Sequence, residues 1–337
     1  MRYNVNKLNF KSPSDRQSMN QQIKLGIGIT ATILGSMAIA YHQQIVESIA
    51  TNLRVSPAVA QAQPLKIVFP TRSSAGTTDL PTKAKAVTDF LSKELQQPVE
   101  AVFGDDTAAV EALRANRADV AFLSSRPALK AKQLANATMY LAEVRANYSG
   151  GHTYKSIFVV PKNSPLKSGK GEATLSQLRG KKIVFTSATS GSGFIFPVAE
   201  LVQMKLVPDR DRLTGFFGQV AYGGGYDKAL QSVLKGQSDV AAVSEYTLGA
   251  PYITAAEAST LRVLYSISGV PAHGISIDDD VPVAKRKQIV AAMLKLNQPA
   301  NNQLLRDLYN STELVEVDHD KHLKPMRDAS ARAGMQP

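Results

Sequence analysis

Apolar and polar positions along the chain form two patterns, one typical of strands and one typical of helices. Short apolar runs of β-type residues predict strands at 65–69, 99–103, 118–123 and 139–144. Between the first two runs, apolar residues recur at helical spacing at Ala84, Val87, Leu91 and Leu95. Farther on, Asp106 is placed to cap a helix over 107–116. Because strand and helix signals alternate, the pattern predicts an α/β protein with parallel or mixed sheets flanked by helices.

Two phrases of this pattern occur twice, in the same order. Residues 66–69 with the Ser/Thr/Gly loop 71–76 resemble residues 182–185 and their loop, shifted by 116 positions (66 to 182). The phrase 119–124 matches 239–244, shifted by 120 positions (119 to 239). Two ordered matches with nearly equal shifts predict two similar lobes.

The repeat predicts where a ligand binds and how the lobes divide the chain. In α/β lobes, ligands bind beyond the carboxyl ends of the strands, where both loops and both terminal serines, Ser124 and Ser244, are expected. We therefore predict a hydroxyl-lined cleft between two lobes, with connecting strands at 154–161 and 260–267. The predicted division is 63–153 and 255–337 for lobe 1, and 154–254 for lobe 2.

The N-terminal region, 1–62, is predicted to be an export signal or signal anchor followed by a linker. Basic residues precede the apolar run 25–41, and small-x-small sites follow at 38–40, 58–60 and 60–62. The run is 17 residues long (25 to 41), at the lower limit for spanning a bilayer. A cleaved signal and a retained anchor both place the rest of the chain outside the cytoplasm. The alternative is a buried helix of a soluble protein.

The amino-acid composition limits which binding sites and ligands the chain can have. The chain of 337 residues contains no cysteine, which excludes disulfides, thiolate metal sites and a lipid anchor on cysteine, and suits an oxidising compartment. Its net charge of +11 favours anionic ligands or surfaces, although solvated charge explains it as well. No interleaved basic and aromatic pattern supports nucleic-acid binding. The histidines are scattered, and 278–280 is predicted to be a loop, so neither a metal site nor a cofactor is expected.

The segment 186–193 carries the most informative chemistry. After the apolar run 182–185, hydroxyl and glycine residues lead into a second apolar, helix-compatible run. Such a turn exposes backbone N–H groups at the positive end of a helix dipole, which is an oxyanion site; we assign it to Thr189, Ser190, Gly191 and Ser192. An ordinary Ser/Gly turn with a helix cap fits the same residues. The segment has neither the Gly-Lys-Ser/Thr of a nucleotide P-loop nor the flanking glycines of a hydrolase elbow.

Further candidate ligand-binding residues lie at the other predicted strand ends and turns. They are Arg72 and Ser73 in the first-lobe loop, Ser124 and Arg126 after the strand 118–123, Tyr154, Tyr226 and Asp227 after a glycine run, and Glu245. Guanidinium groups suit phosphoryl oxygens, and a carboxylate can accept a proton from a ligand P–OH group or bind an amino group. Each has a simpler explanation: a surface arginine, a plain turn in which Asp227 caps the helix, or a solvated glutamate.

From about residue 64 to 300 the sequence resembles the phosphonate/phosphite/phosphate-binding proteins of ABC importers. The resembling phrases are 90–99, 112–123, 190–197, 225–230 and 236–243. The resemblance implies the two-lobed, two-crossover fold of type II periplasmic binding proteins. It also implies that Ser190, Gly191 and Ser192 hold the phosphoryl oxygens and that Tyr154 lies in an aromatic crossover strand.

Two departures from the family pattern concern the ligand. Tyr226 stands where the family commonly has His, and Ser124-Ser125-Arg126 stands where Gly with a nearby aromatic residue is common. An extra guanidinium and fewer aromatic residues favour a small, highly charged oxyanion over an organic phosphonate.

The sequence thus predicts an exported, monomeric binding protein that captures a phosphorus oxyanion between two lobes for a membrane permease. Capture requires hinge closure but no covalent step, so no enzyme activity is expected. Two other functions remain open: a membrane-tethered ectodomain that senses an oxyanion, and an enzyme acting on a small phosphorylated molecule. The sequence shows no nucleophile–base pair for the latter.

Overall fold

The computed structural model describes residues 63–71 and 79–336. Residues Gln63–Pro337 form one compact unit of the chain. The predicted export segment, as well as Arg72 and Ser73, lies outside the described residues. Among the residues that are described, no helix is long and apolar enough to cross a membrane.

The first sheet has the strand order β11-β4-β10-β3-β1-β2. Its strands are β1 (Leu65–Pro70), β2 (Val99–Gly104), β3 (Val120–Leu123), β4 (Thr138–Val144), β10 (Gly274–Ile277) and β11 (Glu313–Glu316). Strand β1 pairs in parallel with β2 and β3, whereas β10 runs antiparallel to both β3 and β4. The sheet is therefore mixed, as predicted.

Helices cover both faces of the first sheet. They are α2 (Leu80–Leu95), α3 (Asp106–Arg114), α4 (Ser125–Ala135), α9 (Val283–Leu294) and α10 (Asn302–Tyr309), with a 3₁₀ turn η5 at Lys295–Asn297. The predicted apolar face of α2 is confirmed, since Ala84, Val87 and Leu91 are completely buried. The predicted cap of α3 is wrong by one residue. The helix begins at Asp106, and Asp105 caps it by accepting a 2.7 Å bond from the N–H of Ala108.

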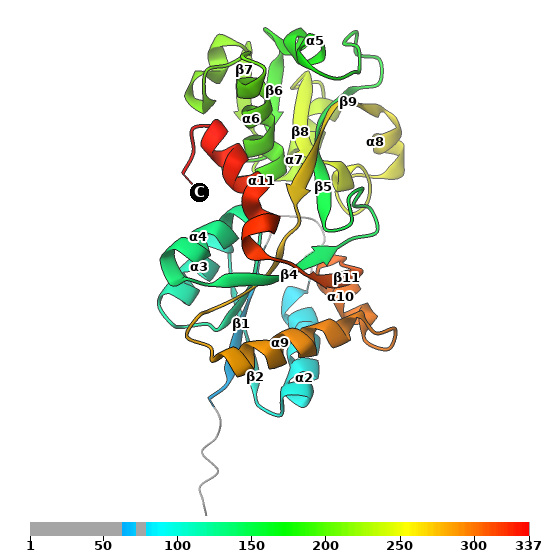
Figure 1. The fold of residues 1–337 in the computed structure, drawn as a ribbon. Coiled ribbons are helices and arrows are strands. Elements are labelled where there is room, and N and C mark those ends of the chain that lie inside the picture. Colours follow the sequence, from blue (N-terminus) through cyan, green and yellow to red (C-terminus); the bar gives the residue numbers. More distant parts are fainter. Residues whose placement is uncertain (1–62, 72–78, 337) are drawn as a thin grey trace, which may run out of the picture. The chain divides into compact units, whose positions relative to one another are not determined.

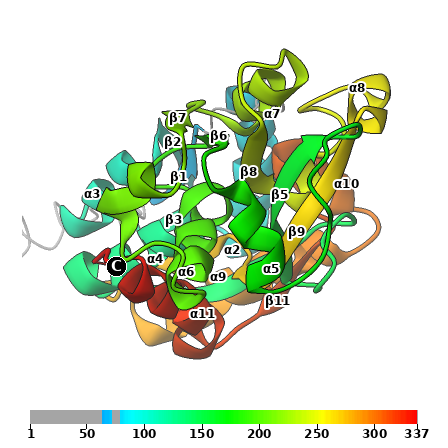
Figure 2. The same ribbon diagram turned by 90° about the horizontal axis from the view of Figure 1, so that it is seen from above.

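The second sheet has the order β7-β6-β8-β5-β9. Its strands are β5 (Thr153–Pro161), β6 (Lys182–Phe185), β7 (Gln219–Tyr222), β8 (Val240–Ser244) and β9 (Leu261–Pro271). Its helical elements are α5 (Glu172–Leu175), η1 (Ser176–Leu178), the π-turn η2 (Gly191–Ile195), α6 (Phe196–Gln203), η3 (Arg210–Gly215), α7 (Tyr226–Leu234), η4 (Glu245–Thr247) and α8 (Ala255–Ser259). Alternate residues of β5 enter different apolar clusters, Phe158 with α6 and Ile157 with α7. Helices α6 and α7 therefore cover opposite faces of the sheet (Figure 2).

The repeated phrases occupy equivalent places in the two sheets. In the first, the Asp119 carboxylate accepts a 2.7 Å bond from the N–H of Lys66. In the second, Asp239 accepts a 2.8 Å bond from the N–H of Lys182. The repeated sequence thus corresponds to a repeated structural unit. In each copy, two strands pair in parallel, and the aspartate before one strand accepts a hydrogen bond from the backbone of the other.

The chain passes between the sheets twice, at residues 145–152 and 272–273, which we call the crossover segments (Figure 1). Residues 255–271, which the sequence analysis assigned to lobe 1, lie with the second sheet, because β9 pairs with β5 along most of its length. The last helix, α11 (His319–Arg332), follows β11 of the first sheet. It packs against α4 and β4 as well as against α6, η2 and β9, so it spans both halves.

Candidate functional site

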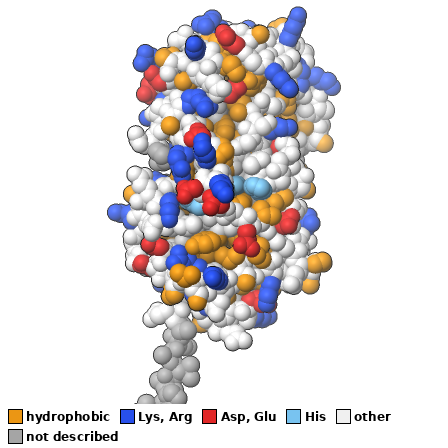
Figure 3. All heavy atoms as spheres, viewed as in Figure 1, with side chains coloured by type: hydrophobic (Ala, Val, Ile, Leu, Met, Phe, Trp, Pro, Cys, Tyr) orange, Lys and Arg blue, Asp and Glu red, His pale blue; other side chains and the backbone are white. Residues whose placement is uncertain are grey.

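A cavity of about 730 Å³ lies between the carboxyl ends of the two sheets' parallel strands. It is lined by Thr71, Lys83, Asp105, Asp106, Thr107, Ser124, Ser125, Arg126, Arg145, Asn147, Tyr154, Thr186, Ser187, Thr189, Ser190, Gly191, Gly224, Gly225, Tyr226, Tyr246, Ala250, Pro251, Tyr252, His273, Arg306, Asp307, Leu308, Tyr309 and Asn310. The lining comes from both halves, which is the arrangement expected of a cleft that closes on a ligand. On the outer face seen in Figure 3, Lys/Arg and Asp/Glu side chains are interspersed.

One end of the cavity, the hydroxyl end, consists of Thr186, Ser187, Thr189, Ser190 and Gly191. The predicted strand-to-helix turn is confirmed, since β6 ends at Phe185 and η2 begins at Gly191. Ser190 is the N-cap residue, and its Oγ accepts a 3.0 Å bond from the N–H of Gly193. The segment contains the helix cap that the simpler interpretation predicted. Its hydroxyl and backbone groups also line the cavity, as an oxyanion site would require.

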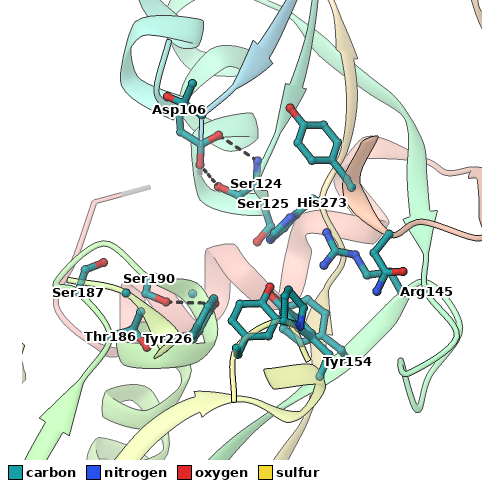
Figure 4. A pocket seen from close by; sticks show the side chains of 18 of the residues that line it. Asp106, Ser124, Ser125, Arg145, Tyr154, Thr186, Ser187, Ser190, Tyr226 and His273 are labelled. Carbon is teal, nitrogen blue, oxygen red and sulfur yellow. Dashed lines mark hydrogen bonds between the residues drawn. The ribbon is translucent and has the colours of Figure 1, made fainter. Parts of the chain in front are cut away.

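Ser192 lies behind the hydroxyl end and does not line the cavity. Its side chain is fully buried, 2.5 Å from Ser244 Oγ and 2.9 Å from the hydroxyl of Tyr226. Tyr226 itself lines the cavity and lies 3.5 Å from Ser190 Oγ (Figure 4). The buried hydroxyls of Ser192 and Ser244 thus position the tyrosine that faces the ligand space.

Helix α7 begins at the cavity without a side-chain cap. Its N-cap residue is Gly225, so the predicted capping role of Asp227 is wrong. Asp227 lies in the first turn and outside the cavity lining, and its Oδ1 is buried with no hydrogen-bond partner among the described residues. The first N–H groups of α7 are consequently free of side-chain caps at the wall of the cavity.

The first sheet contributes the start of helix α4. Ser124 lines the cavity, but its hydroxyl donates a 2.5 Å bond to Asp106 instead of capping the helix (Figure 4). Arg126 also lines the cavity, and its Nη2 donates to the carbonyl of Gln336 at 3.1 Å. Burial, and secondarily the like charge of Arg210, lowers the pKa of Arg126. Arg210, from the second half, therefore lies near enough to Arg126 for their charges to interact, although it does not line the cavity.

Glu245 has a structural environment outside the cavity lining. Its carboxylate accepts bonds from the N–H and hydroxyl of Ser149 at 3.0 and 2.8 Å, and from the N–H of Lys155 at 2.9 Å. These bonds tie a crossover segment to β5. The serine at the end of β8, not the glutamate after it, is connected to the cavity wall.

The opposite end of the cavity, the crossover end, consists of Arg145, Tyr154, Tyr246, Tyr252 and His273. Only Tyr154 was predicted from the sequence. Tyrosines from β5, η4 and the loop after it gather here, with ring centroids 5.2 Å apart for Tyr154 and Tyr246. Burial raises the pKa of Tyr154, so its hydroxyl stays protonated.

Arg145 forms a buried ion pair at this end. Its Nη2 lies 2.9 Å from Glu143 Oε1, and its guanidinium lies over the rings of Tyr148 and Tyr246, 5.6 and 5.2 Å from their centroids. Burial alone would lower the pKa of Arg145, but Glu143 together with the neighbouring tyrosines Tyr148, Tyr246 and Tyr252 outweighs burial, and the pKa is raised. A sequence signal for this pair exists: Glu143 is a charged residue near the end of the apolar strand β4, and Arg145 follows the strand directly.

The two walls of the cavity approach each other closely at Gly191. A methyl group placed on Gly191 would lie 2.7 Å from Met326 Cε of α11 and 3.9 Å from Ser125 Oγ of α4. The helix starts of α4 and η2 therefore face one another across a narrow gap. Converging helix N-termini supply N–H donors and positive dipole ends, which favour an anion between them.

Two α/β halves, two crossover segments and an anion-favouring cleft define a periplasmic-type solute-binding protein. The sequence profile of the phosphonate periplasmic substrate-binding proteins of ABC transporters matches residues 68–323. This chain belongs to that family of transporter substrate-binding components.

Solved structures agree with this fold. Methylphosphonate-bound PhnD1 from Prochlorococcus marinus is 20% identical, with a TM-score of 0.65 over 80% of this chain and 98% of that one. A binding protein component of a phosphonate ABC transporter from Pseudomonas aeruginosa is 18% identical, with a TM-score of 0.62 over 80% and 87%. XAC2383 from Xanthomonas citri, bound to ATP, is 18% identical, with a TM-score of 0.65 over 80% and 98%. A search of curated proteins gave no match.

Proposed function

We propose that the chain captures a phosphonate outside the cytoplasm, with its phosphonyl oxygens at the hydroxyl end, and delivers it to an ABC permease. The observation that carries this proposal is the meeting of three helix starts, α4, η2 and α7, at one cavity. Of these, α4 and α7 have no side-chain cap, so their N–H groups remain for a ligand. Methylphosphonate in the similar PhnD1 supports the ligand class.

The proposed contacts with the ligand come from both halves of the protein. Thr189, Ser190 and Gly191 from the second half, and Ser124 and Arg126 from the first, contact the phosphonyl oxygens directly. Tyr226 contacts the ligand as well, whereas Ser192 acts through it. Arg72 and Ser73, which follow the cavity residue Thr71, belong to the proposed contacts on sequence grounds alone.

The lobes that close on the ligand are proposed as residues 63–152 with 272–337, and 153–271, following the two sheets. The chain is proposed to work as a monomer, in which the two halves of one chain supply both walls of the cavity. Location in the periplasm, by a cleaved signal or an anchor within residues 25–41, is proposed from the sequence.

A thermal-shift panel tests the proposed ligand class. Methylphosphonate, phosphite, phosphate, 2-aminoethylphosphonate and sulfate are added separately to the full chain, because a ligand that binds only the folded state must raise its melting temperature. We expect the phosphorus oxyanions to stabilise the protein more than sulfate does. Titration calorimetry of Ser190→Ala locates the site. Its control is Ser232→Ala, because the Ser232 hydroxyl pairs with that of Ser238 and lies outside the cavity lining. Stabilisation by none of the phosphorus oxyanions would overturn the proposal.

A further inference from the structure

The crossover end contains a buried arginine whose hydrogen-bonding capacity is only partly used. Arg145 is 8% exposed, and its guanidinium points from the backbone toward His273 and the cavity (Figure 4). Its hydrogen bond within the described part of the chain runs from Nη2 to Glu143. Its Nε is buried and has no partner among the described residues. A buried donor without a partner is costly, so the site favours a ligand that accepts from it.

The surroundings hold this guanidinium rigidly in place. Glu143 fixes Nη2, and the ring of Tyr246 lies over the guanidinium plane. Glu143 is itself held by the hydroxyl of Tyr148 at 2.8 Å and the hydroxyl of Ser311 at 2.6 Å. Because Glu143 and two tyrosine rings constrain the guanidinium, the N–H groups of Nε and Nη1 are held in fixed directions. Charged N–H donors held in this way suit the oxygens of a carboxylate.

The rest of this end suits an acidic group better than a basic one. The Glu143 carboxylate lies outside the cavity lining, and its oxygens already contact Arg145, Tyr148, Ser311 and His273. A ligand ammonium group would thus meet a guanidinium instead of an accessible carboxylate. The tyrosine hydroxyls of Tyr154 and Tyr246 are protonated at neutral pH, because burial raises the pKa of both, and they can donate to an anion.

We propose that Arg145 is a specificity residue that binds a carboxylate on the organic substituent of the ligand, so that the preferred substrates are phosphonocarboxylates. This inference rests on the proposed function, which places the phosphonyl group at the hydroxyl end of the same cavity. A cavity of about 730 Å³ leaves room for a substituent, since pockets of 300 to 1,000 Å³ accept much larger ligands than methylphosphonate. Glu143 reduces the net charge near the carboxylate, so the expected gain is moderate.

Titration calorimetry on the full chain tests the inference with a matched ligand pair. Phosphonoacetate and phosphonoacetamide have nearly the same shape and differ in the charge of the group that would meet Arg145. We expect phosphonoacetate to bind at least about tenfold more tightly than phosphonoacetamide, as charge-assisted hydrogen bonds predict. It should also bind more tightly than 2-aminoethylphosphonate. Equal affinity for the matched pair would overturn the inference.

The variant Arg145→Lys separates the guanidinium fork from its charge. It keeps a cation beside Glu143, and we expect it to bring the affinities for phosphonoacetate and phosphonoacetamide to within about threefold of each other. Arg179→Lys is the control, because Arg179 also stacks on an aromatic ring, that of Phe216, but lies outside the cavity lining. If Arg145→Lys does not fold, the matched ligands on the unchanged protein still decide the question.

Failure of this inference and failure of the proposed function give different results. Binding of methylphosphonate without a preference for phosphonoacetate would overturn the carboxylate site and leave the proposed function intact. Binding of no phosphonate at all would overturn both.

Discussion

The two ends of the cavity are built in different ways. At the hydroxyl end, neighbouring residues of one loop supply hydroxyls and backbone N–H groups, and Ser190 is 3.0 Å from the N–H that it caps. At the crossover end, Arg145, Tyr246 and His273 come from three distant parts of the chain and are held by burial and by Glu143. The hydroxyl end suits any tetrahedral oxyanion, because backbone donors recognise charge and shape. The crossover end, built from side chains, distinguishes one substituent from another.

The two ends of the cavity also differ in how they tolerate substitutions. A buried ion pair cannot lose one partner without leaving a charge in a poorly solvated place. A loop of hydroxyls and glycines loses single hydrogen bonds at lower cost, but it tolerates little added volume. Substitutions at each end of the cavity test this contrast.

Glu143→Ala should have the largest effect on stability. The substitution leaves the buried Arg145 without its counter-charge, and we expect the free energy of unfolding to fall by about 3–5 kcal/mol in urea titrations. Asp89→Ala is the control, because its pair with Lys85 is exposed and should be worth about 0–1 kcal/mol. Equal losses for both variants would contradict the structural role assigned to Glu143.

Gly193→Ala tests the tight packing behind the hydroxyl end. The added Cβ would lie 2.1 Å from Thr186 Oγ1 and 2.4 Å from Thr186 Cβ, so the loop must shift. We expect unfolding to become easier by about 1–3 kcal/mol and methylphosphonate to bind at least tenfold more weakly in calorimetry. Gly215→Ala, where no atom lies within 4 Å of the added Cβ, should change neither quantity by much. An unaltered Gly193→Ala protein would show that the loop is looser than described.

Ser192→Ala and Tyr226→Phe test the buried hydroxyl chain behind the cavity wall. Each substitution removes the same 2.9 Å hydrogen bond, so each should lower stability by about 0.5–1.5 kcal/mol, and the double variant should lose less than the sum. Phosphonate affinity should fall several-fold in both single variants. Additive losses in a double-mutant cycle would mean that the two hydroxyls act separately.

Asp106→Asn should increase the affinity for a dianionic ligand, because it removes a negative charge from the wall of the cavity. Asp106 lines the cavity and accepts a bond from Ser124, so its negative charge lies near the expected phosphonyl group. We expect methylphosphonate to bind a few-fold more tightly at low salt, an effect on the order of 1 kcal/mol that decreases as salt is added. Glu111→Gln, on the same helix and paired with exposed Arg114, is the control. A loss of affinity would instead assign Asp106 to orienting Ser124.

The smallest effect concerns two buried histidines beside the crossover segments. His322 Nε2 lies 3.1 Å from the carbonyl of Ala272, His319 Nδ1 accepts from the N–H of Met139, and burial lowers the pKa of both below 6.5. The unfolded chain then binds protons at a higher pH than the folded one. The free energy of unfolding should therefore decrease as the pH falls below about 6.5. Urea titrations at about pH 7.5 and 5.5 measure this decrease, and His322→Gln should reduce it. An equal decrease in that variant would exclude His322 as a contributor.

Much of the fold could be predicted because its signals are local. The spacing of Ala84, Val87 and Leu91 predicted the buried face of α2, and the repeated phrases predicted two sheets that share one arrangement of strand pairs. The cap of α3 was assigned one residue late, because Asp105 and Asp106 are chemically equal in sequence. The lobe assignment of residues 255–271 differed from the sheets, because only β9 pairing with β5 places that segment.

The sequence by itself determined the hydroxyl end of the cavity. A strand, a run of small hydroxyl residues and a helix follow one another within one segment, and the backbone N–H groups of such a combination favour an anion. Only the tertiary structure decided the crossover end and the true place of Ser192. Those contacts join residues far apart in the chain. Burial, not residue type, holds the guanidinium of Arg145 in place and makes Ser192 a residue that positions Tyr226.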